Sequence, residues 1–300
     1  MSRGLVSIFA LPQEIDDLHL TLYNLKRNIA MLPPELELDI DITFCLSDEL
    51  TDWENSKLPR EYFADRFESL RPLMDWSKNP MINVEYGSEI LGCVSQRRHS
   101  LSSSGGYDFT IWLDTDIFFK DTTLPYLIGS YETVVESGYD CCIITPQFIR
   151  QWDATWDVLV HEAFLGSTLN THEDADIIKI SLFDAGEVAI KPITGFKFGG
   201  GWCTLLSNKL LRIIGIPEVL GHYGLEDTFI TSACDMMWKR NTPNLPIQFV
   251  LQNHIVGEVY KHRCNQHMKR WVTSRNRKDE FRAIATQNFS QAMAQLVRGM

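Results

Sequence analysis

Two carboxylates one residue apart interrupt a dense apolar run over residues 109–119, at Asp114 and Asp116. Such a run predicts a strand buried on both faces of a parallel sheet, and side chains at positions i and i+2 of an extended chain point the same way. The two carboxylates can therefore bind one divalent cation where the strand leaves the sheet, since ligands bind at the carboxyl ends of strands in open α/β sheets. From this triplet alone, a cap for the turn over Lys120–Pro125 is an equal alternative.

A second pair of acids and a late histidine are the other residues suited to chemistry. Glu226 and Asp227 open a predicted helix over Asp227–Trp238, where the helix dipole by itself would stabilise them. His254 lies in a predicted strand over Pro246–Val256, and a single His in a strand is more often a core or surface residue than a ligand. Their order along the chain, more than any one of them, indicates a site.

These residues need a scaffold, and strand and helix signals alternate along the first half of the chain. We predict strands at 6–11, 38–44, 82–86, 109–119, 140–146, 187–193 and 246–256, and helices at 16–30, 91–102, 123–137, 210–214 and 227–238. The β-α-β-α-β order predicts an α/β fold with a doubly wound, mostly parallel sheet and helices on both faces. Three consecutive glycines, Gly199–Gly201, either let the backbone approach a ligand closely or form a tight turn.

The composition fits a globular protein with a substantial core. The chain has 300 residues, and 44% of them are hydrophobic, which is enough for one large α/β domain. No apolar run reaches the ~18 residues that a membrane span needs. The adjacent Cys141 and Cys142 look like small buried hydrophobes of a reduced compartment. We therefore expect a cytoplasmic protein with no membrane span.

The net charge of −11 is unevenly distributed. Residues 261–300 carry nine Lys and Arg against two acids, a charge of +7 that leaves −18 for the rest of the chain. An acidic body is a poor platform for nucleic acid or an anionic membrane. The basic tail either contacts phosphate groups or forms a solvated face.

Taken in order, these features resemble the GT-A class of nucleotide-sugar glycosyltransferases over most of the chain. Residues 92–98 resemble the helix whose Arg approaches the nucleotide, and residues 114–116 match the D-x-D motif. Residues 199–201 match the acceptor-side glycine loop, and residues 226–227 match the x-E-D motif. His254 matches the late metal-binding His of the class.

The resemblance implies a function, a cofactor and a set of site residues. The function is metal-dependent transfer of a sugar from a nucleotide-sugar donor, with a UDP- or GDP-sugar expected first, to a hydroxyl of a glycan, lipid-linked or protein acceptor. The cofactor is Mn²⁺ or Mg²⁺, and a His ligand favours Mn²⁺. The implied metal ligands are Asp114, Asp116 and His254; the donor-binding residues are Asp48, Arg97, Arg98, Asp114, Gly200 and Gly201; the base is Asp227, with Glu226 second.

Several finer points follow from the resemblance. Within a single GT-A-like domain, residues 1–119 are expected to form the nucleotide-binding half, residues 120–262 the acceptor- and metal-binding half, and residues 263–300 a basic C-terminal segment. Residues 253–260 loosely resemble fungal mannan-polymerase-type mannosyltransferases, although we expect no membrane anchor here. For Asp48, an exposed loop position is the simpler interpretation. An inverting enzyme needs the base, whereas in a retaining enzyme Asp227 would only orient hydroxyl groups.

Three other functions stay open. A nucleotidyltransferase or sugar-phosphate pyrophosphorylase also uses Asp on a doubly wound sheet, but it favours a Gly-rich basic loop where residues 10–17 of this chain are acidic. A DNA-modifying glycosyltransferase fits the basic tail and not the acidic body. A non-catalytic binding module would keep the fold and the metal site, and the presence of every expected polar position argues against it.

Overall fold

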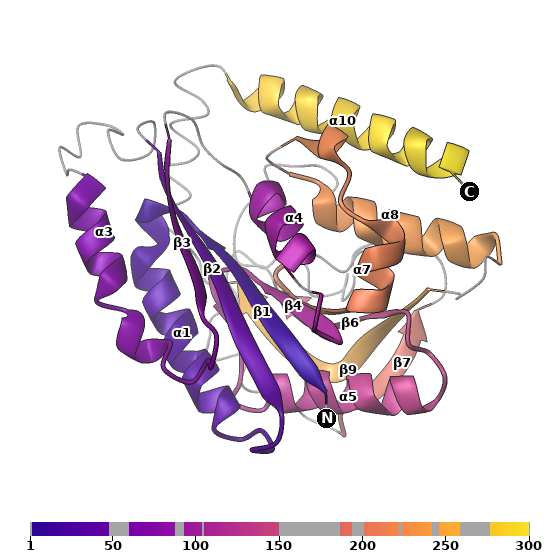
Figure 1. The fold of residues 1–300 in the computed structure, drawn as a ribbon. Coiled ribbons are helices and arrows are strands. Elements are labelled where there is room, and N and C mark those ends of the chain that lie inside the picture. Colours follow the sequence, from indigo (N-terminus) through magenta and orange to yellow (C-terminus); the bar gives the residue numbers. More distant parts are fainter. Residues whose placement is uncertain are drawn as a thin grey trace.

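The computed structural model describes residues 2–47, 60–87, 93–103, 105–149, 187–193, 201–221, 224–241, 246–258 and 277–299. Figure 1 shows a twisted sheet with helices on both faces. Across these ranges, no helix combines the length and the apolar character that a bilayer crossing requires.

One sheet joins all nine strands of the described ranges, in the order β3-β2-β1-β4-β8-β6-β9-β5, with β7 paired to β9. The strands are β1 Arg3–Ala10, β2 Glu37–Ser47, β3 Met81–Gly87, β4 Phe109–Leu113, β5 Ile117–Phe118, β6 Cys142–Ile149, β7 Ala189–Ile193, β8 Cys203–Ser207 and β9 Ile247–Glu258. Because strands from both predicted halves join this sheet, the prediction of a single α/β domain is confirmed. The internal division at residue 119 stays a prediction.

The sheet is mixed, and only its N-terminal part is fully parallel. β1 runs parallel to β2 and β4, and β2 runs parallel to β3. β8 is antiparallel to both β4 and β6, while β9 is parallel to β6 and antiparallel to β5 and β7. All five residues of β8 are buried, and a strand buried on both faces has the same sequence pattern in either direction. The expectation of a mostly parallel sheet therefore holds for the first strands and fails at β8.

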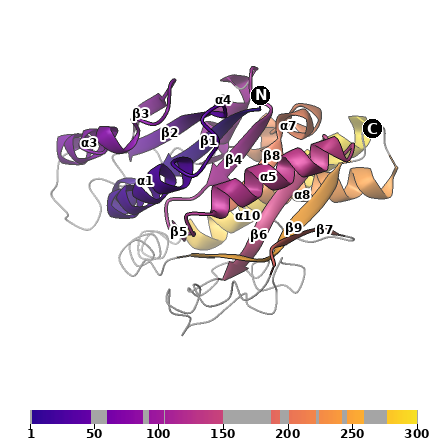
Figure 2. The same cartoon turned by 90° about the horizontal axis from the view of Figure 1, so that it is seen from below.

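Helices cover the two faces of the sheet and form two apolar cores. The helices are α1 Ile15–Ile29, α3 Arg60–Glu68, α4 Cys93–Ser103, α5 Thr123–Glu136, α7 Asn208–Ile214, α8 Glu226–Lys239 and α10 Arg277–Gly299, with short turns η1 Pro12–Glu14, η3 Arg71–Leu73 and η6 Glu218–Leu220. Residues of α1, α3 and α5 pack into one core, and residues of α4, α7, α8 and α10 pack into the other. Figure 2 shows α1 and α5 from below, both on the first of these faces.

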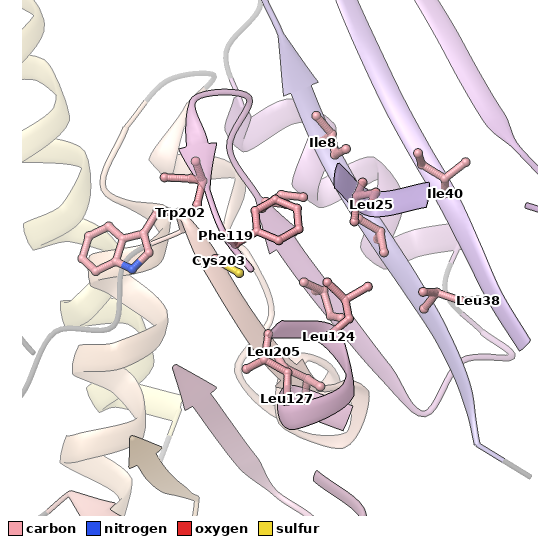
Figure 3. Close-up of a cluster of buried hydrophobic side chains, with 14 of the residues drawn as sticks. Ile8, Leu25, Leu38, Ile40, Phe119, Leu124, Leu127, Trp202, Cys203 and Leu205 are labelled. Atoms are coloured by element: carbon pink, nitrogen blue, oxygen red, sulfur yellow. The ribbon is translucent and has the colours of Figure 1, made fainter. Parts of the chain in front are cut away.

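The first core extends under the D-x-D motif. Figure 3 shows Phe119, which follows β5, among Ile8 of β1, Leu25 of α1 and Leu124 of α5. The Phe119 side chain is 1% exposed, so burial of its ring ties the segment after the motif to the sheet. The second core is completed by α10, a long helix that the sequence patterns did not predict.

Gly4 in β1 packs closely against side chains of the first core. A Cβ atom on Gly4 would lie 2.2 Å from Phe109 Cε2 and 2.8 Å from Leu38 Cδ1. We expect Gly4→Ala to lower the free energy of unfolding by about 1–3 kcal/mol, because overpacking forces buried side chains off their rotamers. Urea unfolding measures the change. Gly129→Ala is the control, since Gly129 in α5 has open space around it, and there we expect a gain of up to about 1 kcal/mol from helix propensity.

Candidate active site

The D-x-D motif lies at the carboxyl end of β4, as predicted. The Asp114 N–H donates to the Trp202 carbonyl oxygen at 3.0 Å, which joins the end of β4 to the start of β8. The Asp114 side chain is 48% exposed, whereas the Asp116 side chain lies in the protein, with the residue 8% exposed. The two carboxylates of the motif therefore have different environments.

Arg97 of α4 connects this motif to the x-E-D motif. Its guanidinium pairs with the Glu226 carboxylate, and its Nη2 donates to Asp114 Oδ1 at 3.2 Å. Its carbon Cζ lies 4.5 Å from the centre of the Trp112 ring, within the range of a cation–π contact. Burial alone would lower the pKa of Arg97, but the neighbouring Glu226 and Asp114 carboxylates raise that pKa above its ordinary value. Arg97 is thus a permanent buried cation between the two motifs.

Glu226 begins α8 and is almost fully buried. Its side chain is 3% exposed, and Cys93 Sγ donates a hydrogen bond to its Oε1 at 3.3 Å. Burial, and next the charge of Glu226, raise the pKa of Cys93 well above its ordinary value, so the thiol stays protonated and remains a donor. Glu226 is therefore committed to Arg97 and Cys93.

Asp227 is half-buried, and backbone N–H groups hold both of its oxygens. Gly201 N donates to Oδ2 at 3.1 Å, and Thr228 N donates to Oδ1 at 2.6 Å. Burial, with a further contribution from Glu226, raises the pKa of Asp227 to about 6. The carboxylate is therefore ionised at neutral pH, yet more basic than an exposed Asp.

Gly201 lies between the two charged groups. Its carbonyl oxygen accepts from Arg97 Nη2 at 3.2 Å, while its N–H holds Asp227. A Cβ atom here would lie 2.4 Å from Arg97 Nη2. A larger residue at this position would therefore displace the Arg97 guanidinium from its place between the two motifs.

A buried polar network fixes α4 on the sheet beside Arg97. Gln96 Nε2 donates to Asp41 Oδ2 at 3.1 Å and to Ser7 Oγ at 2.7 Å, and the Ser100 hydroxyl donates to the same Asp41 oxygen. Asp41 is fully buried, and burial raises its pKa to about 7. The network sets the position of α4, from which Arg97 extends.

Asp41 is expected to make stability depend on pH. Because its pKa is 3.8 in an unfolded reference and about 7 in the fold, the folded chain binds the extra proton between these values, and stability falls as pH rises through this window. In the wild-type protein, we expect the free energy of unfolding to fall by about 2–4 kcal/mol from pH 4 to pH 8 because of Asp41, and Asp41→Asn should abolish this fall. Urea unfolding at both pH values measures it. Asp140→Asn, at an exposed ion pair with Lys209, should keep the wild-type fall.

The late histidine contacts a different part of the fold from the one predicted. His254 is fully buried; its Nε2 lies 2.9 Å from Thr123 Oγ1, and its ring packs against Tyr126 at 5.1 Å between centroids. Over the described ranges, no three His, Cys, Asp or Glu side chains are grouped so that they could hold a metal ion. In this structure His254 is therefore not grouped with Asp114 and Asp116, and its Nε2 lies beside Thr123 of α5. The metal-ligand role of the three residues stays a prediction.

Arg98, the second predicted donor-binding arginine, is not brought together with Arg97. Arg98 points to the η6 turn, where it donates to the carbonyl oxygens of Ile216, Pro217 and Gly221 at 2.9–3.2 Å. It holds the segment that leads to the x-E-D motif. Asp48 and Gly200 lie outside the described residues, so their roles stay predictions.

Two residues of the site had no predicted role. Trp112 provides the ring under Arg97, and Cys93 donates to Glu226. The sequence gives little indication of these roles. Trp on a buried strand and Cys on a helix are both typical of an apolar core. Trp202, which precedes β8, packs in the first core (Figure 3).

Comparisons with known proteins bear on the fold. No family model matches the sequence, and no curated protein matches it either. Among solved structures, GalNAc-T7, crystallised with UDP, GalNAc and Mn²⁺, superposes with a TM-score of 0.50 at 12% identity, covering 87% of this chain and 44% of that one. This neighbour is a GT-A glycosyltransferase. The chain has a GT-A-like fold.

A second solved structure aligns over most of the chain. S. aureus TarS (residues 1–349) aligns with a TM-score of 0.49 at 14% identity, covering 96% of this chain and 71% of that one. This chain thus spans less than half of GalNAc-T7 and about seven tenths of the TarS fragment. Identities this low describe the GT-A-like fold alone.

Proposed function

We propose that this GT-A-like chain is a glycosyltransferase that moves a sugar from a nucleotide-sugar donor to an acceptor hydroxyl. The observation that carries the proposal is the Arg97 bridge, which links Asp114 of the D-x-D motif to Glu226 of the x-E-D motif at the carboxyl end of β4. Asp114 lies 17 positions from Arg97 in the sequence and Glu226 lies 129 positions from it, yet both contact its guanidinium. A purely structural role does not require this convergence at the end of the sheet where ligands bind.

Asp227 is the proposed base, and Glu226 is not. Glu226 already pairs with Arg97 and accepts from Cys93, whereas Asp227 is half-buried with a pKa of about 6. In the proposed step, Asp227 takes the proton of the acceptor hydroxyl while that oxygen forms a bond to C1 of the sugar. The bond from C1 to the diphosphate breaks, and the diphosphate leaves with the electron pair.

We propose that a divalent cation, Mn²⁺ or Mg²⁺, accompanies the donor and contributes Lewis-acid charge when bound. Asp114 and Asp116 are the candidate carboxylate ligands, without His254. GalNAc-T7 was crystallised with Mn²⁺ and UDP, which supports testing UDP-sugars with Mn²⁺ first. This chain's own contribution to the donor is the half-exposed Asp114 carboxylate, which Arg97 holds at the end of β4.

A thermal-shift panel tests the proposal. UDP-, GDP-, CMP- and dTDP-sugars are each added with Mn²⁺ and with EDTA. Each nucleotide sugar is used at about 100 times its own dissociation constant where that concentration can be reached. Binding at that level stabilises the fold by about 2.7 kcal/mol, which corresponds to a rise in Tm of roughly 4 °C for a chain of 300 residues. We expect the sugars of one nucleotide family to raise Tm in the presence of Mn²⁺. We also expect the protein to transfer the sugar of those donors slowly to water or to an acceptor.

Two variants serve as test and control. Asp114→Asn should abolish the Tm shift, because it removes the half-exposed carboxylate of the motif. Asp121→Asn changes a carboxylate seven residues away that pairs with Arg27 at the surface, and it should leave the shift intact. A folded wild-type protein that responds to no donor, with or without metal, would overturn the proposed function.

A further inference from the structure

Helix α1 carries three polar side chains at positions that should be apolar or exposed. Thr21 and Asn28 are 2% and 0% exposed, and Asn24 is half-buried. They are spaced i, i+3 and i+7, so they share one face of the helix. Thr and Asn are poor helix formers, because their side chains compete for backbone hydrogen bonds. Neither helix formation nor packing in the apolar core explains why three such residues lie on one face of α1.

All three side chains bond to the backbone of the segment that carries the D-x-D motif. Thr21 Oγ1 donates to the Thr115 carbonyl oxygen at 2.6 Å, within the motif itself. Asn24 Nδ2 donates to the Phe119 carbonyl oxygen at 2.7 Å. Each of these contacts joins residues more than 90 positions apart in sequence.

Asn28 holds both this segment and the start of the next helix. Its Nδ2 donates to the Lys120 carbonyl oxygen at 3.0 Å, and its Oδ1 accepts from Leu124 N at 3.0 Å. Leu124 lies in the first turn of α5, and Thr122, at the N-cap position of α5, makes no side-chain capping bond. Asn28 therefore supplies from α1 the cap that α5 lacks.

The backbone of the motif is thus held from two sides. On one side, the Asp114 N–H is bound to Trp202 and β5 pairs with β9. On the other side, side chains of α1 donate hydrogen bonds to the carbonyl oxygens of Thr115, Phe119 and Lys120. The direction of the half-exposed Asp114 carboxylate, which a ligand can reach, depends on this backbone.

We propose that Thr21, Asn24 and Asn28 are positioning residues that set the affinity for the donor by fixing the D-x-D backbone. The proposal rests on the proposed function, because a donor must bind at Asp114 for its affinity to be set. The residues act through the carbonyl groups of the loop and do not touch the ligand. A buried carbonyl that loses its donor costs the full desolvation of that group, so the loop should move to satisfy it.

The sharpest test removes a single hydroxyl group. Thr21→Val keeps the shape of the side chain and leaves the Thr115 carbonyl without its donor. We expect the donor KM to rise about tenfold while kcat changes by less than about twofold, since the contact acts on donor binding and not on the chemical step. Amide hydrogen exchange over residues 115–124 should become faster. Thr21→Ser keeps the hydroxyl and should restore both readouts.

Two control variants separate positioning from general destabilisation. Thr133→Val makes the same chemical change on α5, where the hydroxyl only donates to the Gly129 carbonyl of its own helix. Ile128→Val removes one buried methylene from α5 and touches no bond of the loop. Both should keep the wild-type donor KM, even where Tm falls as far as in Thr21→Val.

The outcomes distinguish this inference from the proposed function. Wild-type turnover together with an unchanged donor KM in Thr21→Val overturns the positioning role alone. If wild-type protein uses no donor, the proposed function fails and the effect on donor affinity fails with it, and the exchange data then test only whether α1 fixes the backbone of the loop. Unchanged exchange over residues 115–124 in Thr21→Val then overturns it, and faster exchange that Thr21→Ser reverses supports the hold of α1 on the loop.

Discussion

Arg97→Met is expected to lower the free energy of unfolding by about 3–5 kcal/mol, because it leaves Glu226 as an uncompensated buried charge. Both side chains of the pair are almost fully buried, at 6% and 3% exposed. Met retains most of the apolar stem of Arg, so lost packing contributes little and lost charge dominates. Urea unfolding at pH 7.5 measures the effect, and the change in the midpoint should occur without a change in slope.

The double variant Arg97→Met/Glu226→Gln shows whether charge is the cause. Without the buried carboxylate, we expect at least about 2 kcal/mol of the loss to be recovered, since an apolar replacement for a buried pair is often neutral. Lys26→Met is the exposed counterpart, because Lys26 pairs with Asp75 at 2.7 Å on the surface, and it should cost less than about 1 kcal/mol. Additive losses in the double variant would contradict the buried-pair interpretation.

Asp227→Asn should reduce the transfer rate by about 10²–10⁴-fold while the donor still binds, because an amide cannot take the proton of the acceptor. One of the two backbone bonds should survive, since the Asn Oδ1 can accept from Gly201 N or Thr228 N, while the amide NH2 cannot accept from the other. Single-turnover transfer and the donor thermal shift, measured on the same preparation, separate the chemical step from binding. Loss of donor binding together with transfer would indicate a binding role instead of a base.

The pH dependence gives an independent check on the base. Wild-type kcat/KM should rise as pH increases through about 6, the pKa of Asp227, and then level off, because only the ionised carboxylate accepts a proton. This rise of kcat/KM with pH should be absent in Asp227→Asn. In Arg97→Met it should move to higher pH, since Arg97 lowers the pKa of Asp227.

Asp235→Asn is a matched control for Asp227→Asn on the same helix. Asp235 forms an i, i+4 pair with Lys239 at 2.7 Å. Its replacement should leave both the rate and the pH limb at wild-type values. A comparable rate loss in this variant would indicate a general effect of charge on α8.

The fold class follows from local patterns that the sequence contains. Alternation along residues 38–44 predicts β2, and apolar spacing along residues 16–30 predicts α1. The apolar run over residues 109–119 predicts one strand, which the structure divides at the two acids into β4 and β5, with Asp114 at the carboxyl end of β4. These patterns are reliable because the burial of each face is encoded within a single segment. The helix that Glu226 and Asp227 open was predicted on the same ground and is α8.

Pairings between distant segments could not be predicted in this way. Either of two adjacent arginines was a candidate for the site, and side chains at i and i+1 of a helix point about 100° apart, so one at most reaches it. Only the packing of α4 decides that Arg97 meets Glu226 and that Arg98 meets η6. In the same way, the fold assigns His254 to Thr123 and reverses the direction of β8.

The sequence by itself thus determined most of the strands and helices and the order of the acidic motifs in this protein. The tertiary structure alone decided which charges meet: the Arg97 bridge, the bonds of Gly201 to Asp227, and the hold of α1 on the D-x-D loop. The physical reason is that periodicity reports which face of a segment is buried, whereas a hydrogen bond between segments depends on where the whole fold places both partners.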